Sequence, residues 1–162
     1  MSTNRRVGRE YALKTLFALQ LDKEQKEAGK LLDSFLNDFH FADDVLGEPL
    51  VVGKVTLTTA AKLFAELIVS GVVEFRSVID KKITEVAKNW SLERMAPVDL
   101  SILRIGAYEL LYQPETPAPV VIDEAIEIAK RYGTKDSPSF INGLLDKIAK
   151  DARTAGRNDL SN

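Results

Sequence analysis

The stretch PVDLSILRIGAYELLY, residues 97–112, predicts a helix that is buried on nearly every side. Proline is favourable at the first position, because a first-turn N–H has no partner inside a helix. Apolar residues then follow almost all round the helix: Leu100, Ile102, Leu103, Ile105, Tyr108, Leu110 and Leu111. A helix that is apolar all round needs neighbours all round. We therefore expect residues 97–112 to form a central helix of an all-α protein.

Two further helices are predicted on the C-terminal side of this stretch. The three prolines of QPETPAP, residues 113–119, end the central helix. Residues 120–132 have one apolar and one charged face, and Gly133 is expected to be a left-handed C-cap. Ser137 is expected to be the N-cap of a last helix that ends near residue 153. The polar segment 154–162 is expected to be a flexible tail.

The N-terminal side also has helical spacing. Residues 3–21 are apolar almost all round and predict a second central helix, and Thr58 or Thr59 can cap a third helix. The remaining predicted elements are helices at 28–39, 58–73 and 75–88, a loop at 40–56 and a short turn in WSLERMAP at 90–97. We expect an all-α fold of about seven helices, in two small packed bundles at about 3–75 and 76–153 of a single domain, 1–153.

Composition excludes several classes of function. The 162 residues are 45 % hydrophobic and 28 % charged and include no cysteine, which excludes disulfides, thiolate metal sites and cysteine nucleophiles. No apolar run approaches the roughly 18 residues of a membrane span, and the N-terminus lacks the apolar core of a signal peptide. We expect a cytoplasmic protein without a membrane partner.

The net charge of −2 is unevenly distributed. Residues 1–20 carry four Lys/Arg and one Glu, and residues 130–157 carry seven Lys/Arg and three Asp. The segment 21–129 between them carries eleven positive and nineteen negative charges. If the fold brought the two basic ends together, they would form one positive face. The alternative is that these are ordinary solvated charges.

The sequence contains no pattern that predicts catalysis. It has no nucleotide-binding glycine loop and no HExxH, and its one histidine, His40, lies in the expected loop. Asp43 and Asp44 lack further oxygen ligands at coordinating spacing. Asp123, Glu124 and Glu127 are expected on a solvated helix face. We expect no enzyme, no cofactor and no metal.

Contact with nucleic acid is better supported, at two places. Arg5, Arg6 and Arg9 begin the first helix, where guanidinium groups and free N–H groups suit phosphate. The alternative is a solubilising terminus. At the start of the last helix, Phe140 lies one turn beyond Asp136 and Ser137 and could stack on an unpaired base. The alternative for Phe140 is a place in the core.

Four segments carry a family resemblance: RRVGREYALKTLFALQ at 5–20, DLSILRIGAYELLY at 99–112, VVIDEAIEIAKRYG at 120–133 and DSPSFINGLLDKI at 136–148. Together they resemble the NusB family of bacterial transcription antitermination factors. The resemblance implies two three-helix bundles without catalytic activity or cofactor. It also implies binding of boxA RNA from ribosomal RNA operons together with the ribosomal protein NusE, on RNA polymerase with other Nus factors.

The resemblance assigns roles to particular residues. It implies RNA contacts for Arg5, Arg6, Arg9, Asp136, Ser137 and Phe140, and a NusE contact for Asp99. Val7 and Ser139 depart from the family pattern, because relatives often have arginine and lysine there, and fewer phosphate contacts imply weaker RNA binding. A protein-interaction module without RNA contact is the alternative function. An accessory domain of an RNA methyltransferase fits poorly, since no nucleotide-binding pattern follows.

Overall fold

The computed structural model describes residues 3–21, 30, 32 and 58–159, and every regular element in this part of the chain is helical. The all-α prediction is therefore confirmed. The elements are α1 (Thr3–Leu21), α3 (Thr59–Glu74), α4 (Arg76–Val86), the 3-10 turn η1 (Leu92–Arg94), α5 (Pro97–Tyr112), α6 (Ala118–Tyr132) and α7 (Ser137–Asp159). Nearly all of the helix predicted at 28–39, and the loop at 40–56 with His40, Asp43 and Asp44, lie outside the described residues.

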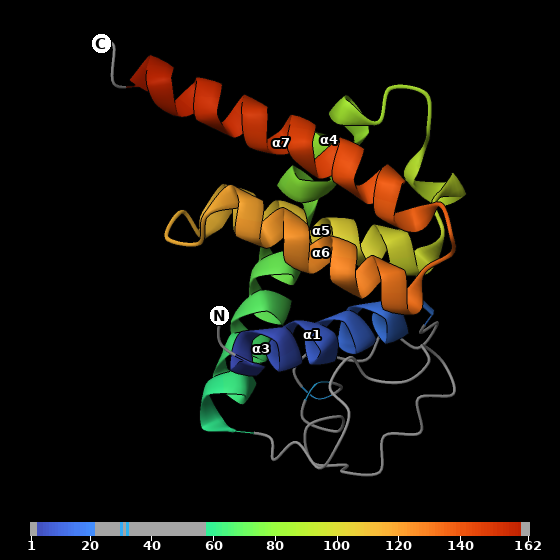
Figure 1. Cartoon of the computed structure of the whole chain (residues 1–162), viewed down its shortest axis with the longest axis vertical. Helices are drawn as coiled ribbons and strands as arrows, with labels where there is room; N and C mark the ends of the chain where they lie inside the picture. The colour runs from blue at the N-terminus through green and yellow to red at the C-terminus, as the bar shows by residue number, and fades with distance from the viewer. Residues whose placement is uncertain (1–2, 22–29, 31, 33–57, 160–162) are drawn as a thin grey trace.

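The helices form layers that two further helices cross (Figure 1). α1, the α5–α6 pair and α7 lie one above another, with α5 and α6 in the middle. α3 packs against α1 and α5, and α4 continues across the stack to pack against α5 and α7. None of the helices in the described part of the chain combines the length and apolar character that a membrane span requires.

α5 is the centre of this arrangement, as predicted for residues 97–112. It packs against all five of the other described α-helices. Every residue from Asp99 to Glu109 is buried. The axes approach closely where α5 meets its neighbours: a Cβ on Gly106 would lie 2.8 Å from a Leu145 methyl of α7, and a Cβ on Gly71 of α3 would lie 2.2 Å from the Tyr108 ring. Glycine at these two positions lets the helices pack this tightly.

Most predicted helix ends are close to the observed ones, for local reasons. Thr58 caps α3, and its hydroxyl accepts a hydrogen bond of 3.1 Å from the N–H of Ala61. Pro97 is the first residue of α5. The turn predicted in 90–97 is η1.

Three predictions at the C-terminal end are wrong. Gly133 has φ −93°, an ordinary extended conformation rather than a left-handed one. Glycine is required there by space instead, since a Cβ would lie 2.6 Å from the Ser137 side chain. Ser137 is the first residue of α7 rather than its cap. α7 also continues to Asp159 instead of ending near residue 153, and the flexibility expected for residues 154–162 stays a prediction.

Candidate nucleic-acid interface

Arg5 extends from α1 to the segment that joins α5 to α6. Its Nη1 donates a hydrogen bond of 2.9 Å to Oγ1 of Thr116. Its guanidinium carbon also lies 5.2 Å from the centroid of the Phe64 ring of α3, within cation–π distance. Arg5 is half-buried, so part of the residue remains accessible.

Arg6 reaches α6 and forms a two-point ion pair with Glu124. Nε and Nη2 donate hydrogen bonds of 3.1 and 3.0 Å to the two carboxylate oxygens. The hydrogen bonds to Glu124 are the main cause that raises the pKa of Arg6 above its ordinary value. The Arg6 side chain is 42 % exposed, whereas that of Glu124 is only 3 % exposed. The expectation of a solvated position was therefore wrong for Glu124, although Asp123 and Glu127 are exposed.

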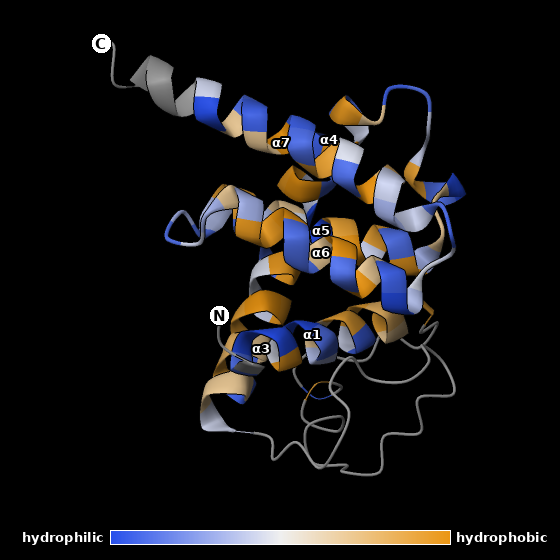
Figure 2. Ribbon diagram, viewed as in Figure 1, coloured by the Kyte–Doolittle hydropathy of each residue, from blue (hydrophilic) through white to orange (hydrophobic). Residues whose placement is uncertain are grey.

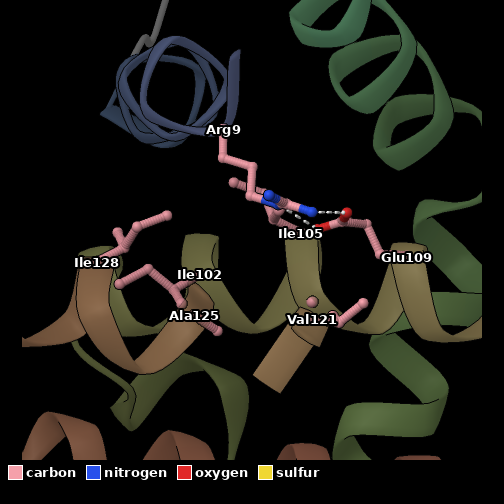
Figure 3. Close-up of a pocket in the computed structure, with 8 residues that line it drawn as sticks. Arg9, Ile102, Ile105, Glu109, Val121, Ala125 and Ile128 are labelled. Carbon is pink, nitrogen blue, oxygen red and sulfur yellow. Dashed lines mark hydrogen bonds and ion pairs between the residues drawn. The ribbon is translucent and has the colours of Figure 1, made fainter. Parts of the chain in front are cut away.

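Arg9 is enclosed between α1 and the α5–α6 pair (Figure 3). Its side chain is 1 % exposed, and Nε and Nη2 donate hydrogen bonds of 2.9 and 2.7 Å to the buried carboxylate of Glu109. In this conformation a phosphate cannot reach the guanidinium, so the RNA contact predicted for Arg9 would require α1 to move away from α5. The sequence signal for such a buried pair was Glu109, a charged residue in a helix that was predicted to be buried on nearly every side.

The cavity beside this pair is too small for a ligand. Its volume is about 10 Å³, and it is lined by Arg9, Glu109, Gly106 and apolar side chains of α5 and α6 (Figure 3). That volume is close to the space of one water molecule. Nη1 of Arg9 is buried and has no hydrogen-bond partner among the described residues.

A fourth polar contact joins the N-terminal half of α1 to the α5–α6 pair. The hydroxyl of Tyr132, the last residue of α6, donates a hydrogen bond of 2.6 Å to Oε1 of buried Glu10. Residues 5, 6, 9 and 10 of α1 therefore each have a polar partner in α5, α6 or the segment between them. We call the part of this junction formed by Arg5, Arg6, Thr116 and Glu124 the α1–α6 seam. Solvent reaches its two arginines, whereas Thr116 and Glu124 are buried.

The second predicted cluster, at the start of α7, is only partly accessible. Asp136 is exposed, and Phe140 is half-buried, with its ring against the core. Ser137 is 1 % exposed, and its hydroxyl accepts a hydrogen bond of 2.9 Å from the N–H of Thr134. In this conformation Asp136 and Phe140 can reach a ligand, whereas the Ser137 side chain serves the turn that precedes α7.

The two basic ends do not form the single face that the charge pattern suggested. α1 and α7 lie on different sides of the α5–α6 pair (Figure 1). α6 nevertheless connects the clusters, since its Glu124 holds Arg6 and its C-terminal end leads through residues 133–136 to α7. Figure 2 shows hydrophilic residues in the N-terminal half of α1 and at the C-terminal end of α6, next to the segment that leads to α7.

Two other predicted features concern Asp99 and metals. Asp99 is mostly buried in the first turn of α5, and its Oδ1 has no hydrogen-bond partner in the described part of the chain. Within residues 3–21 and 58–159, no three acidic or histidine side chains are grouped so that they could hold a metal ion. Val7, a position where an additional arginine would be typical, is buried in the core, and Ser139 is exposed.

The fold and the site define a small all-α protein whose N-terminal helix presents two accessible arginines beside a buried polar junction. Comparison with known proteins gives the family. The sequence model of the NusB family matches residues 6–150. The transcription antitermination protein NusB of Syntrophotalea carbinolica is 49 % identical over 149 residues, which are 92 % of this chain and 94 % of that protein. The chain belongs to the NusB family.

Solved structures agree with this assignment. A crystal structure of NusB from T. maritima superimposes with a TM-score of 0.76 at 37 % identity, covering 93 % of both chains. A chain in a crystal structure of the antitermination factors NusB and NusE in complex with double-stranded RNA gives a TM-score of 0.74 at 22 % identity, covering 93 % of this chain and 99 % of that one. The second likeness concerns the fold alone.

Proposed function

We propose that this protein is a transcription antitermination factor that binds boxA RNA of ribosomal RNA operons together with the ribosomal protein NusE. In this role it helps RNA polymerase, with other Nus factors, to read through terminators. Family membership carries the proposal, because the match over residues 6–150 includes both Arg6 and the start of α7. The name of the Syntrophotalea relative and the NusE–RNA complex of a fold neighbour support it.

The accessible residues divide between affinity and discrimination. Arg5 and Arg6 at the α1–α6 seam hold phosphates, which supply affinity without sequence information. Asp136 and Phe140 contact unpaired bases, whose edges and faces are open in a single strand. Asp99, at the start of α5, faces NusE. Arg9 and Ser137 act indirectly, since one anchors α1 and the other shapes the turn before α7.

Binding of labelled boxA RNA and of a scrambled RNA, with and without NusE, tests this function. We expect Arg5→Ala and Arg6→Ala to weaken binding of both RNAs alike. Each lost phosphate contact should lower the salt slope, the change of log K with log salt concentration, by about 0.7. Lys81→Ala is the control, because Lys81 is an exposed cation on α4, away from the α1–α6 seam.

The same titration separates RNA binding from a purely protein-binding function. If the protein binds NusE but neither RNA, alone or in the complex, the RNA function is wrong. Equal salt slopes for the wild type and for Arg6→Ala would contradict the phosphate role of Arg6 in particular.

A further inference from the structure

The Arg6–Glu124 pair is unequal in a way that bears on ligand binding. The carboxylate is almost completely buried, whereas two-fifths of the Arg6 side chain is exposed. The pair therefore presents its cation to solvent and conceals its anion. A carboxylate that only competed with RNA for Arg6 would not need to be enclosed in this way.

The hydrogen bonds to Glu124 occupy one edge of the Arg6 guanidinium and leave the other edge for a ligand. Nε and Nη2 bind Glu124, and no residue in the described part of the chain bonds to Nη1 of Arg6. An arginine held along one edge keeps N–H groups on its other edge for a phosphate oxygen. Arg5 is held similarly, by Thr116 and by the Phe64 ring.

The geometry points to Glu124 as the positioning residue that orders Arg6 for a phosphate of the bound RNA. This inference rests on the proposed RNA function. Ordering a long side chain on binding costs about 0.5–1.5 kcal/mol, which corresponds to roughly two- to tenfold in affinity. Because Glu124 already holds Arg6 in the free protein, much of that ordering precedes RNA binding.

A simple charge argument gives the opposite result. Removing a carboxylate near RNA reduces repulsion and should strengthen binding. Glu127 provides the matched control, since it also raises the pKa of Arg6 through its charge but is exposed and pairs with Lys130. Glu124→Gln removes the charge and the two-point ion pair with Arg6, whereas Glu127→Gln removes a charge and the exposed pair with Lys130 but no hydrogen bond to Arg6.

The test measures fluorescence anisotropy of labelled boxA RNA with the full-length variants over a range of salt concentrations. We expect Glu124→Gln to weaken binding about two- to tenfold. We expect its salt slope to fall toward that of Arg6→Ala. Glu127→Gln should bind as tightly as the wild type or more tightly. In an Arg6→Ala background, Glu124→Gln should have no further effect on RNA affinity.

Two results would overturn the inference while RNA binding itself stands. One is equal or tighter binding by Glu124→Gln. The other is the same loss of affinity with and without Arg6, together with a lowered thermal midpoint, which indicates a purely structural role. If Arg6→Ala binds RNA as the wild type does, the failure lies instead in the proposed role of Arg6, and the inference falls with it.

Discussion

Three arginines within five positions of α1 have three different environments. Arg5 lies over an aromatic ring, Arg6 pairs with a buried carboxylate while staying half-exposed, and Arg9 is enclosed completely. Residues four apart share a helix stripe, which is why Arg5 and Arg9 both contact Phe64. The place of each arginine on α1 relative to α5 then decides whether its side chain remains accessible.

Loss of one partner of the buried pair should strongly destabilise the protein. Arg9→Ala leaves the Glu109 carboxylate buried without a counter-ion, which typically costs about 3–5 kcal/mol. Urea denaturation followed by circular dichroism measures the change in the free energy of unfolding. Arg5→Ala is the comparison and should cost about 1 kcal/mol or less, because Arg5 is half-exposed. Equal midpoints for the Arg9→Ala variant and the wild type would contradict the contribution assigned to the pair.

Phe140 requires variants that separate stacking from packing, because its ring is half-buried against the core. Phe140→Leu keeps an apolar side chain in contact with the core but removes the aromatic face. We expect this variant to remain folded and to lose about 1–3 kcal/mol of boxA binding free energy, the value typical of a base–aromatic stack. RNA titration and thermal melts of the same preparations provide both readouts. Full RNA affinity in a folded Phe140→Leu protein would show that Phe140 belongs to the core only.

At the scale of the elements, one glycine of α5 and one glycine of α7 have different surroundings. Gly106 of α5 lies against Leu145 of α7 so closely that a Cβ would overlap it. Gly143 of α7 is exposed, and nothing lies within 4 Å of where its Cβ would be. Close contact between axes explains the first glycine, whereas the structure gives no packing reason for the second.

Alanine at these two positions should therefore change stability in opposite directions. Gly106→Ala forces α5 and α7 apart or displaces Leu145, which we expect to cost about 1–3 kcal/mol. Gly143→Ala should stabilise by up to about 1 kcal/mol, because alanine favours a helix interior more than glycine does. Thermal and urea unfolding of the two variants check both signs. Destabilisation by Gly143→Ala would contradict the open space that the structure places beside Gly143.

At the scale of the whole molecule, the hydrophobic core is continuous across the two predicted bundles. One cluster of buried side chains includes Leu13 of α1, Ile68 of α3, Ile79 of α4, Leu103 of α5 and Ile148 of α7. α5 packs against helices of both predicted bundles, and α1 is tied to the α5–α6 pair by Arg9 and Glu10. The division at residues 75 and 76 remains an interpretation, but the shared core favours one cooperative unit.

We therefore expect a single unfolding transition. Trp90, the one tryptophan, lies between α4 and η1, so its fluorescence reports on the C-terminal half, whereas far-ultraviolet circular dichroism reports on all helices. Coincident urea midpoints for the two signals are the expected outcome. An earlier transition seen by circular dichroism alone would indicate that the N-terminal bundle unfolds independently.

Local sequence signals predicted much of the fold. Apolar spacing, Pro97 and the threonine cap at residue 58 located five helices to within a few residues, because these signals act within one or two turns. The same reasoning misplaced Glu124 on a solvated face and gave Gly133 a left-handed conformation. For Glu124 the deciding contact is with Arg6, which lies more than a hundred residues away in the chain. For Gly133 it is the space taken by the Ser137 side chain, a contact that depends on how the turn between α6 and α7 folds.

The sequence by itself determined that the chain is all-α, that residues 97–112 are central and that arginines begin the first helix. These properties follow from periodicity and residue type, which are present in the chain before it folds. Only the tertiary structure decided that Arg5 and Arg6 are accessible while Arg9 is enclosed with Glu109. The accessibility of a charge depends on which helix packs against it, and that partner lies about a hundred residues away in the chain.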